Sequence, residues 1–156
     1  MFEGFEHGRI ELDGVEITYR TGGSGSPVLL LHGYPQTHVQ WAKLAPLLAQ
    51  DHTVVCADLR GYGDSGKPAA AADGSTYSFR AMAADQLALM TALGHDRFHV
   101  VGHDRGARVA HRLTLDAPDR VRSLSVLDIV PTYAMSTETH QQLAATYWQW
   151  YFLLQP

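Results

Sequence analysis

The fold is decided by residues 98–108, whose sequence is FHVVGHDRGAR. The apolar start of this stretch, Phe98–Val101, predicts a buried strand, and the residues from Gly106 onward follow a helical pattern. Between them, the segment from Gly102 to Gly106 has the spacing of a nucleophile elbow, a sharp strand-to-helix turn that exposes its central side chain. The glycines two positions before and after the centre allow the strand and the helix to approach closely. The central residue is Asp104.

An aspartate at the centre of this turn selects the chemistry. A carboxylate with an ordinary pKa of about 3.9 is already ionised at neutral pH, so it can displace a leaving group from saturated carbon and form an ester. Hydrolysis of that ester then needs a water, a base such as histidine, and backbone N–H donors for the oxyanion. The alternative interpretation of Asp104 is a helix N-cap, because aspartate is common just before a helix.

Composition and charge limit the classes of partner. At 156 residues the chain can form a core and makes at most one domain. A net charge of −4 with scattered Lys and Arg argues against nucleic acid as a partner. The start, residues 1–6, lacks the features of a signal peptide, and no run approaches the roughly 18 apolar residues of a membrane span. We therefore expect a cytoplasmic protein without membrane contact.

Cysteine and histidine usage gives no sign of a metal or cofactor. The single cysteine, Cys56, lies in an apolar run and is expected to be a buried core residue. The nine histidines are dispersed, and no Cys/His cluster has zinc spacing. The sequence therefore predicts no metal and no cofactor.

Strands and helices are expected to alternate along the chain. A hairpin about Asp13-Gly14 joins strands at 10–12 and 15–19, and the other expected elements are strands at 28–31, 53–57, 98–101 and 121–127 and helices at 38–50, 78–93 and 106–117. Pro46 is a misfit within the first of these helices. Such alternation predicts an α/β fold with a mostly parallel sheet and an antiparallel hairpin at its amino-terminal end.

Polar residues follow several of the expected strands directly. They are His32, Asp58, Asp104 and Asp128. Because active sites of open α/β sheets form at the carboxyl ends of strands, we expect these four residues to share one crevice.

Four segments carry a resemblance to a known family. They are HGYPQTH at 32–38, DLRGYG at 58–63, GHDRGAR at 102–108 and VLDIVPT at 126–132. From about residue 27 to 156, the chain resembles the amino-terminal half of an α/β-hydrolase and, within that fold, the haloacetate (fluoroacetate) dehalogenases. The resemblance implies an α/β-hydrolase fold that is truncated after the start of the cap, with residues 1–130 as a partial core and residues 131–156 as the start of a helical cap.

The resemblance also implies the roles of four side chains. Asp104 attacks the carbon that bears the halogen, and Asp128 orients the catalytic histidine. Arg105 and Arg108 bind the substrate carboxylate, which is physically reasonable because residues three apart share one face of a helix. The alternative for these two arginines is surface pairing with acidic residues of the same region, Asp116 or Asp119, and this is the interpretation that we prefer for Arg112.

The oxyanion hole and the halide site are implied in the same way. Backbone N–H groups of Tyr34 and Arg105 form the oxyanion hole, whereas His32 is expected to organise its loop. A His-Trp pair that helps bind halide in the family falls on Gln149 and Trp150. Glutamine donates hydrogen bonds but carries no positive charge, so activation of C–F is expected to be weaker than activation of C–Cl or C–Br.

The family's catalytic histidine, the rest of the cap and the final strands fall beyond residue 156. His140 is the only histidine after Asp128, and it lies on the expected cap segment. We therefore expect either a piece of a longer enzyme or a chain that a second polypeptide completes.

The function predicted for the complete enzyme is hydrolytic dehalogenation of a haloacetate to glycolate through an aspartyl ester. Its partner is a small anionic substrate, and the complete enzyme is a possible homodimer. Two alternatives stay open. One is an epoxide hydrolase with an aspartate nucleophile, although those enzymes typically carry an aromatic residue where Arg105 stands. The other is a non-catalytic truncated fragment.

Overall fold

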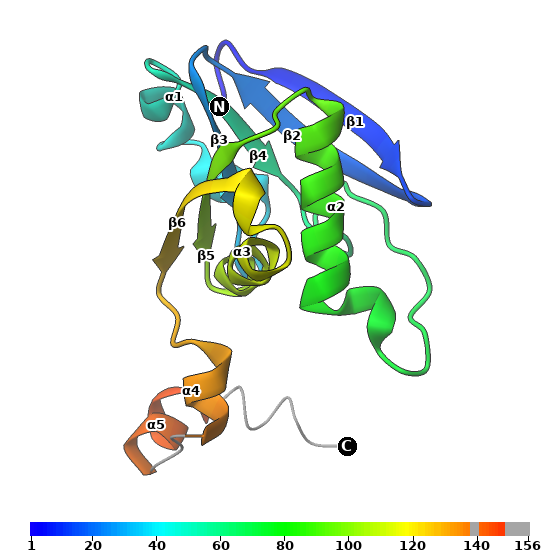
Figure 1. Cartoon of the computed structure of the whole chain (residues 1–156), viewed down its shortest axis with the longest axis vertical. Helices are drawn as coiled ribbons and strands as arrows, with labels where there is room; N and C mark the ends of the chain where they lie inside the picture. The colour runs from blue at the N-terminus through cyan, green and yellow to red at the C-terminus, as the bar shows by residue number, and fades with distance from the viewer. Residues whose placement is uncertain (138–140, 149–156) are drawn as a thin grey trace.

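A six-stranded sheet forms the centre of the molecule (Figure 1). The structure is a computed structural model, and it describes residues 1–137 and 141–148. The strand order is β1-β2-β4-β3-β5-β6. The bounds are β1 Glu6–Leu12, β2 Val15–Gly22, β3 Ser26–Leu31, β4 His52–Ala57, β5 Phe98–His103 and β6 Val121–Leu127.

The predicted α/β architecture is confirmed. β1 and β2 form the antiparallel hairpin, and Asp13 and Gly14 between them have positive φ values of 49° and 81°. β2 pairs antiparallel with β4, whereas β3 pairs parallel with both β4 and β5, and β5 pairs parallel with β6. The sheet is therefore mostly parallel with an antiparallel edge, as the alternation of strands and helices predicts.

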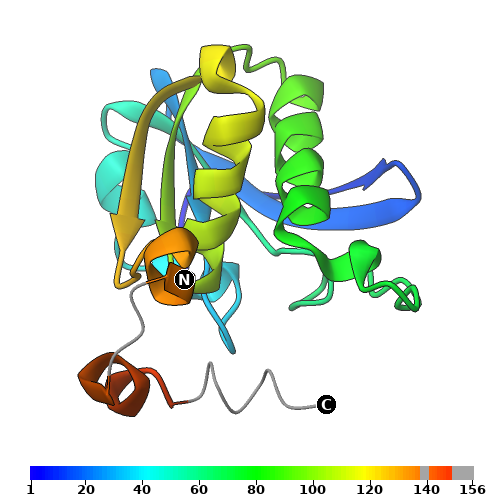
Figure 2. The same cartoon turned by 60° about the horizontal axis from the view of Figure 1, so that its bottom comes forward.

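Helices cover both faces of the central strands (Figure 2). α2 (Phe79–Ala92) and α3 (Arg105–Asp116) pack on one face over the larger core cluster, and the short helices η1 (His38–Trp41) and α1 (Ala45–Leu48) pack on the other. β3 and β4 are consequently apolar on both faces. Cys56 is fully buried in the second cluster, which confirms the prediction, and burial raises the pKa of its thiol.

The expected continuous helix over 38–50 is wrong. The segment forms the 3₁₀ helix η1 and then the single turn α1. Pro46 explains the break, because it has no N–H to donate within a helix and is tolerated only in the first turn, which is the place that it takes in α1. The other two helices are confirmed within about a residue at each end, and Ser78 caps α2 by accepting a hydrogen bond from the N–H of Ala81.

Two further short helices lie beyond the carboxyl ends of the strands (Figure 1). They are α4 (Thr132–Thr137) and α5 (Gln141–Thr146), and the remaining 3₁₀ turns are η2 (Ser75–Tyr77) and η3 (Pro118–Arg120). In residues 1–137 and 141–148, no helix is long and apolar enough to cross a membrane.

Candidate active site

Asp104 lies at the tight turn between β5 and α3, with φ 49° and ψ −116°. The neighbouring glycines make this turn possible. A Cβ on Gly102 would lie 2.5 Å from the Cα of Ala107, and one on Gly106 would lie 2.3 Å from the carbonyl oxygen of Leu31. Strand and helix therefore approach closely enough that only glycine fits on either side, which is the geometry expected of a nucleophile elbow.

The carboxylate of Asp104 reaches across to the loop after β3. Asp104 occupies the N-cap position of α3, but its side chain makes no capping hydrogen bond. Its Oδ1 instead accepts a hydrogen bond of 2.9 Å from the backbone N–H of Tyr34. Asp104 therefore stands at the N-cap position without capping the helix through its side chain, and the N–H of Tyr34 lies at the carboxylate, where the proposed oxyanion donor is needed.

Arg108 lies one helical turn beyond Asp104 and is 5% exposed. Its Nη1 donates to the hydroxyl of Thr132 at 2.9 Å and to the carbonyl of Val130 at 3.3 Å. Burial lowers the pKa of Arg108, and the negative charge of Asp104 acts against that shift. The side chain is thus a buried cation next to the candidate nucleophile, and not the surface ion pair that was the alternative.

Arg105 packs on an aromatic ring of the neighbouring helix. Its guanidinium carbon lies 5.3 Å from the ring centroid of Phe79, the first residue of α2, within the range of a cation–π contact. Its Nε is buried and has no hydrogen-bond partner in the described part of the chain. Arg112, by contrast, forms the predicted surface ion pair with Asp116.

Asp128 follows β6 directly and has a positive φ of 56°. Its side chain is 84% exposed, and its Oδ2 lies 3.9 Å from Nε2 of His103. The Nδ1 of His103 is buried without a hydrogen-bond partner among the described residues. The structure thus brings Asp128 to the elbow, beside the residue that precedes Asp104.

The sequence model of the alpha/beta hydrolase fold family matches residues 26–155. The chain belongs to the alpha/beta hydrolases. It is 59% identical over all 156 residues to a fluoroacetate dehalogenase from Burkholderia sp, of which it covers 51%. It is 42% identical over 125 residues to a soluble epoxide hydrolase from Corynebacterium sp. (strain C12), which corresponds to 80% of this chain and 42% of that one.

Solved structures agree with this assignment. A crystal structure from Nostoc sp PCC 7120, of a protein described as an alpha/beta hydrolase, superposes with a TM-score of 0.96 at 54% identity, over 100% of this chain and 54% of that one. The chain thus spans about half the length of the relatives that it matches.

In this alpha/beta hydrolase, a buried polar cluster holds together the loops that follow β3 and β4. Asp58 is fully buried, and its Oδ1 accepts hydrogen bonds from the backbone N–H of His38 at 2.6 Å and from its Nδ1 at 2.9 Å. Its Oδ2 accepts from the N–H of Asp64 at 3.1 Å. Burial alone would raise the pKa of Asp58, but these hydrogen bonds hold it below its usual value.

His32 ties two of these loops together, as the sequence predicts. Its Nδ1 bonds to the carbonyl of Gly33, and its Nε2 accepts from the N–H of Leu59 at 3.1 Å. Because Nε2 accepts a hydrogen bond it carries no proton, and burial lowers the pKa of His32. His32, Asp58, Asp104 and Asp128 therefore do lie at the same end of the sheet, but His32 and Asp58 act as scaffold.

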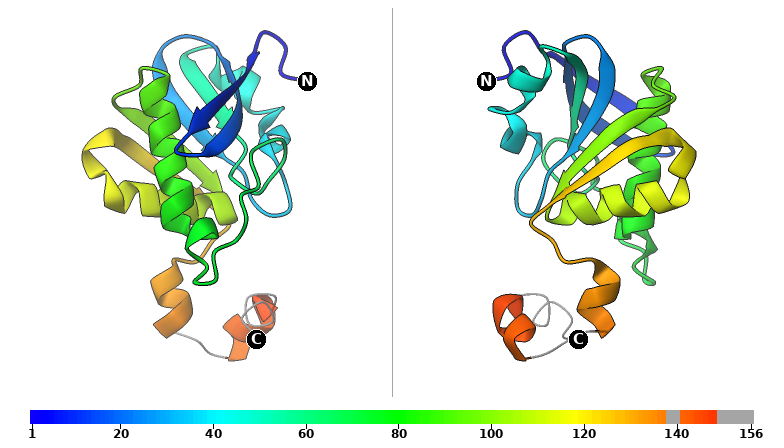
Figure 3. Two further views of the ribbon diagram at one scale, coloured as in Figure 1. Left: turned by 90° about the vertical axis from the view of Figure 1, so that its right-hand side faces the viewer. Right: turned by 60° about the vertical axis from the view of Figure 1, so that its left-hand side comes forward.

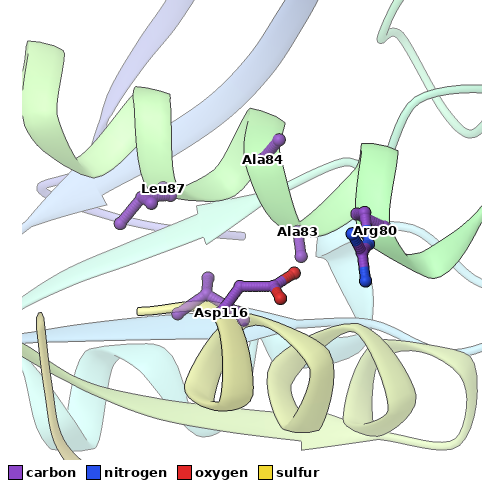
Figure 4. A pocket seen from close by; sticks show the side chains of 6 residues that line it. Arg80, Ala83, Ala84, Leu87 and Asp116 are labelled. Carbon is purple, nitrogen blue, oxygen red and sulfur yellow. The ribbon is translucent and has the colours of Figure 1, made fainter. Parts of the chain in front are cut away.

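A hollow of about 100 Å³ lies away from the elbow, between α2 and α3 (Figure 4). It is lined by Arg80, Ala83, Ala84, Leu87, Leu113 and Asp116. Its lining contains none of the predicted site residues. It therefore forms part of the helix packing and adds nothing to the candidate active site.

Some residues named in the sequence analysis lie outside the part of the chain that the structure describes, and some contacts of the site were not predicted from the sequence. Gln149, Trp150 and His140 are outside the described residues. The sequence analysis missed Phe79 and Thr132 as partners of the two arginines. Thr132 lies within the VLDIVPT segment that carries the resemblance, but its hydrogen bond to Arg108 was not predicted. No sequence signal indicates the contact between Phe79 and Arg105.

Proposed function

We propose that the complete protein hydrolyses a haloacetate to glycolate and halide through an ester on Asp104. The observation that carries this proposal is a pair of cations on α3, the helix that begins directly after Asp104. Arg108 is buried, and Arg105 is held over the ring of Phe79. Guanidinium groups bind carboxylates through charge-assisted hydrogen bonds. A small anionic substrate with a leaving group on the adjacent carbon suits this arrangement.

In the first step, an oxygen of Asp104 attacks the CH₂ carbon of the haloacetate. The C–O bond forms as the carbon–halogen bond breaks, and the halide leaves with the bonding electron pair. No proton moves, because the carboxylate is already ionised. The cations hold the substrate carboxylate and so fix the carbon in line with the attacking oxygen.

In the second step, water adds to the carbonyl carbon of the Asp104 ester and glycolate leaves. The charge that develops on the ester oxygen is stabilised by backbone N–H groups, for which Tyr34 and Arg105 are our candidates. The proton of the attacking water goes to a base, a histidine oriented by Asp128 in the resemblance, and from there to the departing glycolate oxygen.

The halide site and the cap complete the proposal. The resemblance implies that Trp150 and Gln149 bind the halide and that residues 131–156 form the start of a helical cap. Neither Trp150 nor Gln149 brings a positive charge, so the proposal includes a preference for chloroacetate and bromoacetate over fluoroacetate.

Epoxide hydrolysis is the second candidate, because the chain is also 42% identical to a soluble epoxide hydrolase. Opening of an epoxide by Asp104 would form an ester at the same atom. The two candidates differ in substrate charge, since a neutral epoxide has no carboxylate for Arg105 and Arg108 to bind.

The test is single-turnover labelling of the 156-residue chain. Incubation with bromoacetate should place a carboxymethyl ester on the peptide that contains Asp104, and excess acetate should protect it by competing for the arginines. Asp104→Asn should not be labelled there. Peptide mapping is needed because bromoacetate also alkylates exposed histidines, whereas Cys56 is buried.

Two outcomes would contradict the proposal. Labelling of Asp104 by styrene oxide but not by bromoacetate would favour epoxide hydrolysis. Labelling that acetate does not slow would remove the carboxylate-binding role of the arginines.

A further inference from the structure

Two histidines lie close together at the end of the sheet that is remote from the elbow. His52 is the first residue of β4 and His99 is the second residue of β5, and both are half-buried. Their ring centroids are 6.3 Å apart, and the planes of the rings are inclined at 82°. Asp104 follows the carboxyl end of β5, so the pair lies at the amino ends of the parallel strands, outside the candidate active site.

The strand register places both rings on one face of the sheet. β3 lies between β4 and β5, and its residue Ser26 pairs with His52. Two residues further along β3, Val28 pairs with His99. Paired residues of parallel strands, and residues two apart on one strand, point to the same face, so Ser26 shares the face of the two histidines. α2 and α3 pack against the opposite face, which carries Phe98 (Figure 3).

The hydroxyl of Ser26 is a further polar group on this face. Its Oγ is buried and has no hydrogen-bond partner among residues 1–137 and 141–148. Buried polar atoms in native proteins are nearly always hydrogen-bonded to protein, to ordered water or to a bound ion's shell, so an unpaired one needs an explanation. Because Ser26 stands on the strand between His52 and His99, a hydrated ion held by the two rings would supply that partner.

His99 is oriented as a metal-binding histidine is. Its Nδ1 is hydrogen-bonded to the hydroxyl of Ser123 on β6 at 2.7 Å. The two nitrogens of an imidazole point to different sides of the ring, so this contact directs Nε2 away from β6, toward β3 and His52. A hydrogen bond at one ring nitrogen typically fixes the tautomer and the orientation in which the other nitrogen binds a metal.

The surrounding groups favour the neutral form of His99. Burial lowers the pKa of His99, and the charges of Arg122 and of a protonated His52 act in the same direction. Neutral imidazole is the form that binds metal ions. Arg122 itself precedes Ser123 on β6 and so points to the opposite face, where it donates to the carbonyl of Arg97.

We propose that His52 and His99 together bind a divalent transition-metal ion of the class that prefers imidazole, with Cu²⁺ held most tightly, and that the hydroxyl of Ser26 contacts its hydration shell. A ring nitrogen binds such an ion at about 2.0–2.1 Å, so two imidazoles on one ion have their ring centres roughly 5–6.5 Å apart. The observed separation of 6.3 Å lies in this range. In the described part of the chain, no group of three or more His, Cys, Asp and Glu could hold a metal, so water completes the shell around two protein nitrogens.

The experiment is titration of the 156-residue chain with Cu²⁺ at neutral pH, followed by calorimetry, electron paramagnetic resonance and NMR. We expect the first Cu²⁺ to show two imidazole nitrogens in its paramagnetic resonance spectrum and to broaden the amide signals of residues 52 and 99 before those of other histidines. His52→Gln and His99→Gln should each weaken binding at least tenfold and leave one nitrogen. His7→Gln, at an exposed position on β1, is the matched control and should bind as the unchanged chain does.

Three results would overturn the proposal: a first Cu²⁺ with fewer than two imidazole nitrogens, broadening centred on other histidines or on the amino terminus, and equal affinity of His52→Gln and His7→Gln. The first two are measured on the unchanged chain, so they decide the matter even if a variant fails to fold. Ser123→Ala should weaken binding about tenfold through loss of the bond that orients His99, and an unchanged affinity would contradict that orientation. None of these measurements depends on the reaction proposed above.

Discussion

The backbone N–H of Tyr34 donates a hydrogen bond of 2.9 Å to Oδ1 of Asp104, a residue 70 positions away in the sequence. The bond fixes one oxygen of the carboxylate and leaves the other, Oδ2, as the attacking atom of the proposed reaction. If the ester forms through Oδ2, Oδ1 is its carbonyl oxygen and becomes the oxyanion when water adds. In the proposed reaction the same N–H therefore positions the nucleophile in the first step and stabilises charge in the second.

Gly33→Ala should disrupt this contact. A Cβ on Gly33 would lie 2.7 Å from the Cβ of Asp104 and 2.8 Å from Nδ1 of His103, so the loop must move away. Misplacement of a reacting group by about 1 Å can cost about 100-fold in rate, and we expect a fall of that order in the labelling of Asp104 by bromoacetate. Gly94→Ala, at a site with open space and φ 80°, is the control and should lower stability without changing the labelling rate. Equal labelling by the two variants would contradict the role of the Tyr34 contact.

Arg108→Met should weaken binding of haloacetate. Loss of a charge-assisted contact removes about 1.5–3 kcal/mol, or roughly 10- to 150-fold in the half-saturating concentration of bromoacetate for labelling. Arg112→Met is the matched control on the same helix, since Arg112 pairs with Asp116 at the surface. Circular dichroism should confirm that both variants stay folded. Similar concentration dependence for Arg108→Met and Arg112→Met would exclude Arg108 from substrate binding.

Stability should fall as the pH drops below about 6.5, the ordinary pKa of histidine. Burial lowers the pKa of His32, so the unfolded chain binds a proton there at a pH where the folded chain does not. The stabilisation is complete above the ordinary pKa and is lost as the pH falls through the lowered one. In urea unfolding between pH 7 and pH 5, His32→Gln should be less stable at pH 7 but show a shallower loss, whereas exposed His7→Gln should follow the unchanged chain. A slope unaltered by His32→Gln would show that other groups carry the dependence.

The sequence predicted the framework well because its signals are local. Apolar runs at 28–31 and 53–57 mark strands that are buried between helices, and the spacing of Gly102 and Gly106 marks the elbow. The prediction of one helix over 38–50 was wrong although the sequence contains the reason, Pro46. A proline beyond the first turn of a helix interrupts its hydrogen bonding, so a new helix begins there.

The contacts that define the site could not be read in the same way. Arg108 bonds to the carbonyl of Val130, 22 residues away, and to Thr132, 24 residues away. Arg105 rests on Phe79 only because α2 and α3 pack side by side. Each contact depends on where the chain goes after a strand or helix ends, and neither periodicity nor spacing carries that information.

Substitution of Asp58 tests how strongly the loops after β3 and β4 depend on one buried carboxylate. Its carboxylate accepts two hydrogen bonds from His38 and one from the N–H of Asp64. Asp58→Asn replaces one accepting oxygen with an NH₂ group that faces a donor, and leaving a buried hydrogen-bonding group unsatisfied costs about 1–3 kcal/mol, more where charge is involved. Asp119→Asn is the matched control, because Asp119 is exposed on η3.

The stabilities of Asp58→Asn and Asp119→Asn should also depend differently on pH in the acid range. Hydrogen bonding holds the pKa of Asp58 below its usual value, so its contribution to stability is complete above that usual value and is lost as the pH falls through the lowered one. Urea unfolding between pH 5 and pH 3 should therefore show a steeper loss of stability in the unchanged chain and in Asp119→Asn than in Asp58→Asn. If Asp58→Asn unfolds at the same urea concentration as Asp119→Asn at pH 7, the loops after β3 and β4 are held by other contacts, and the buried carboxylate is not what positions Tyr34 for Asp104.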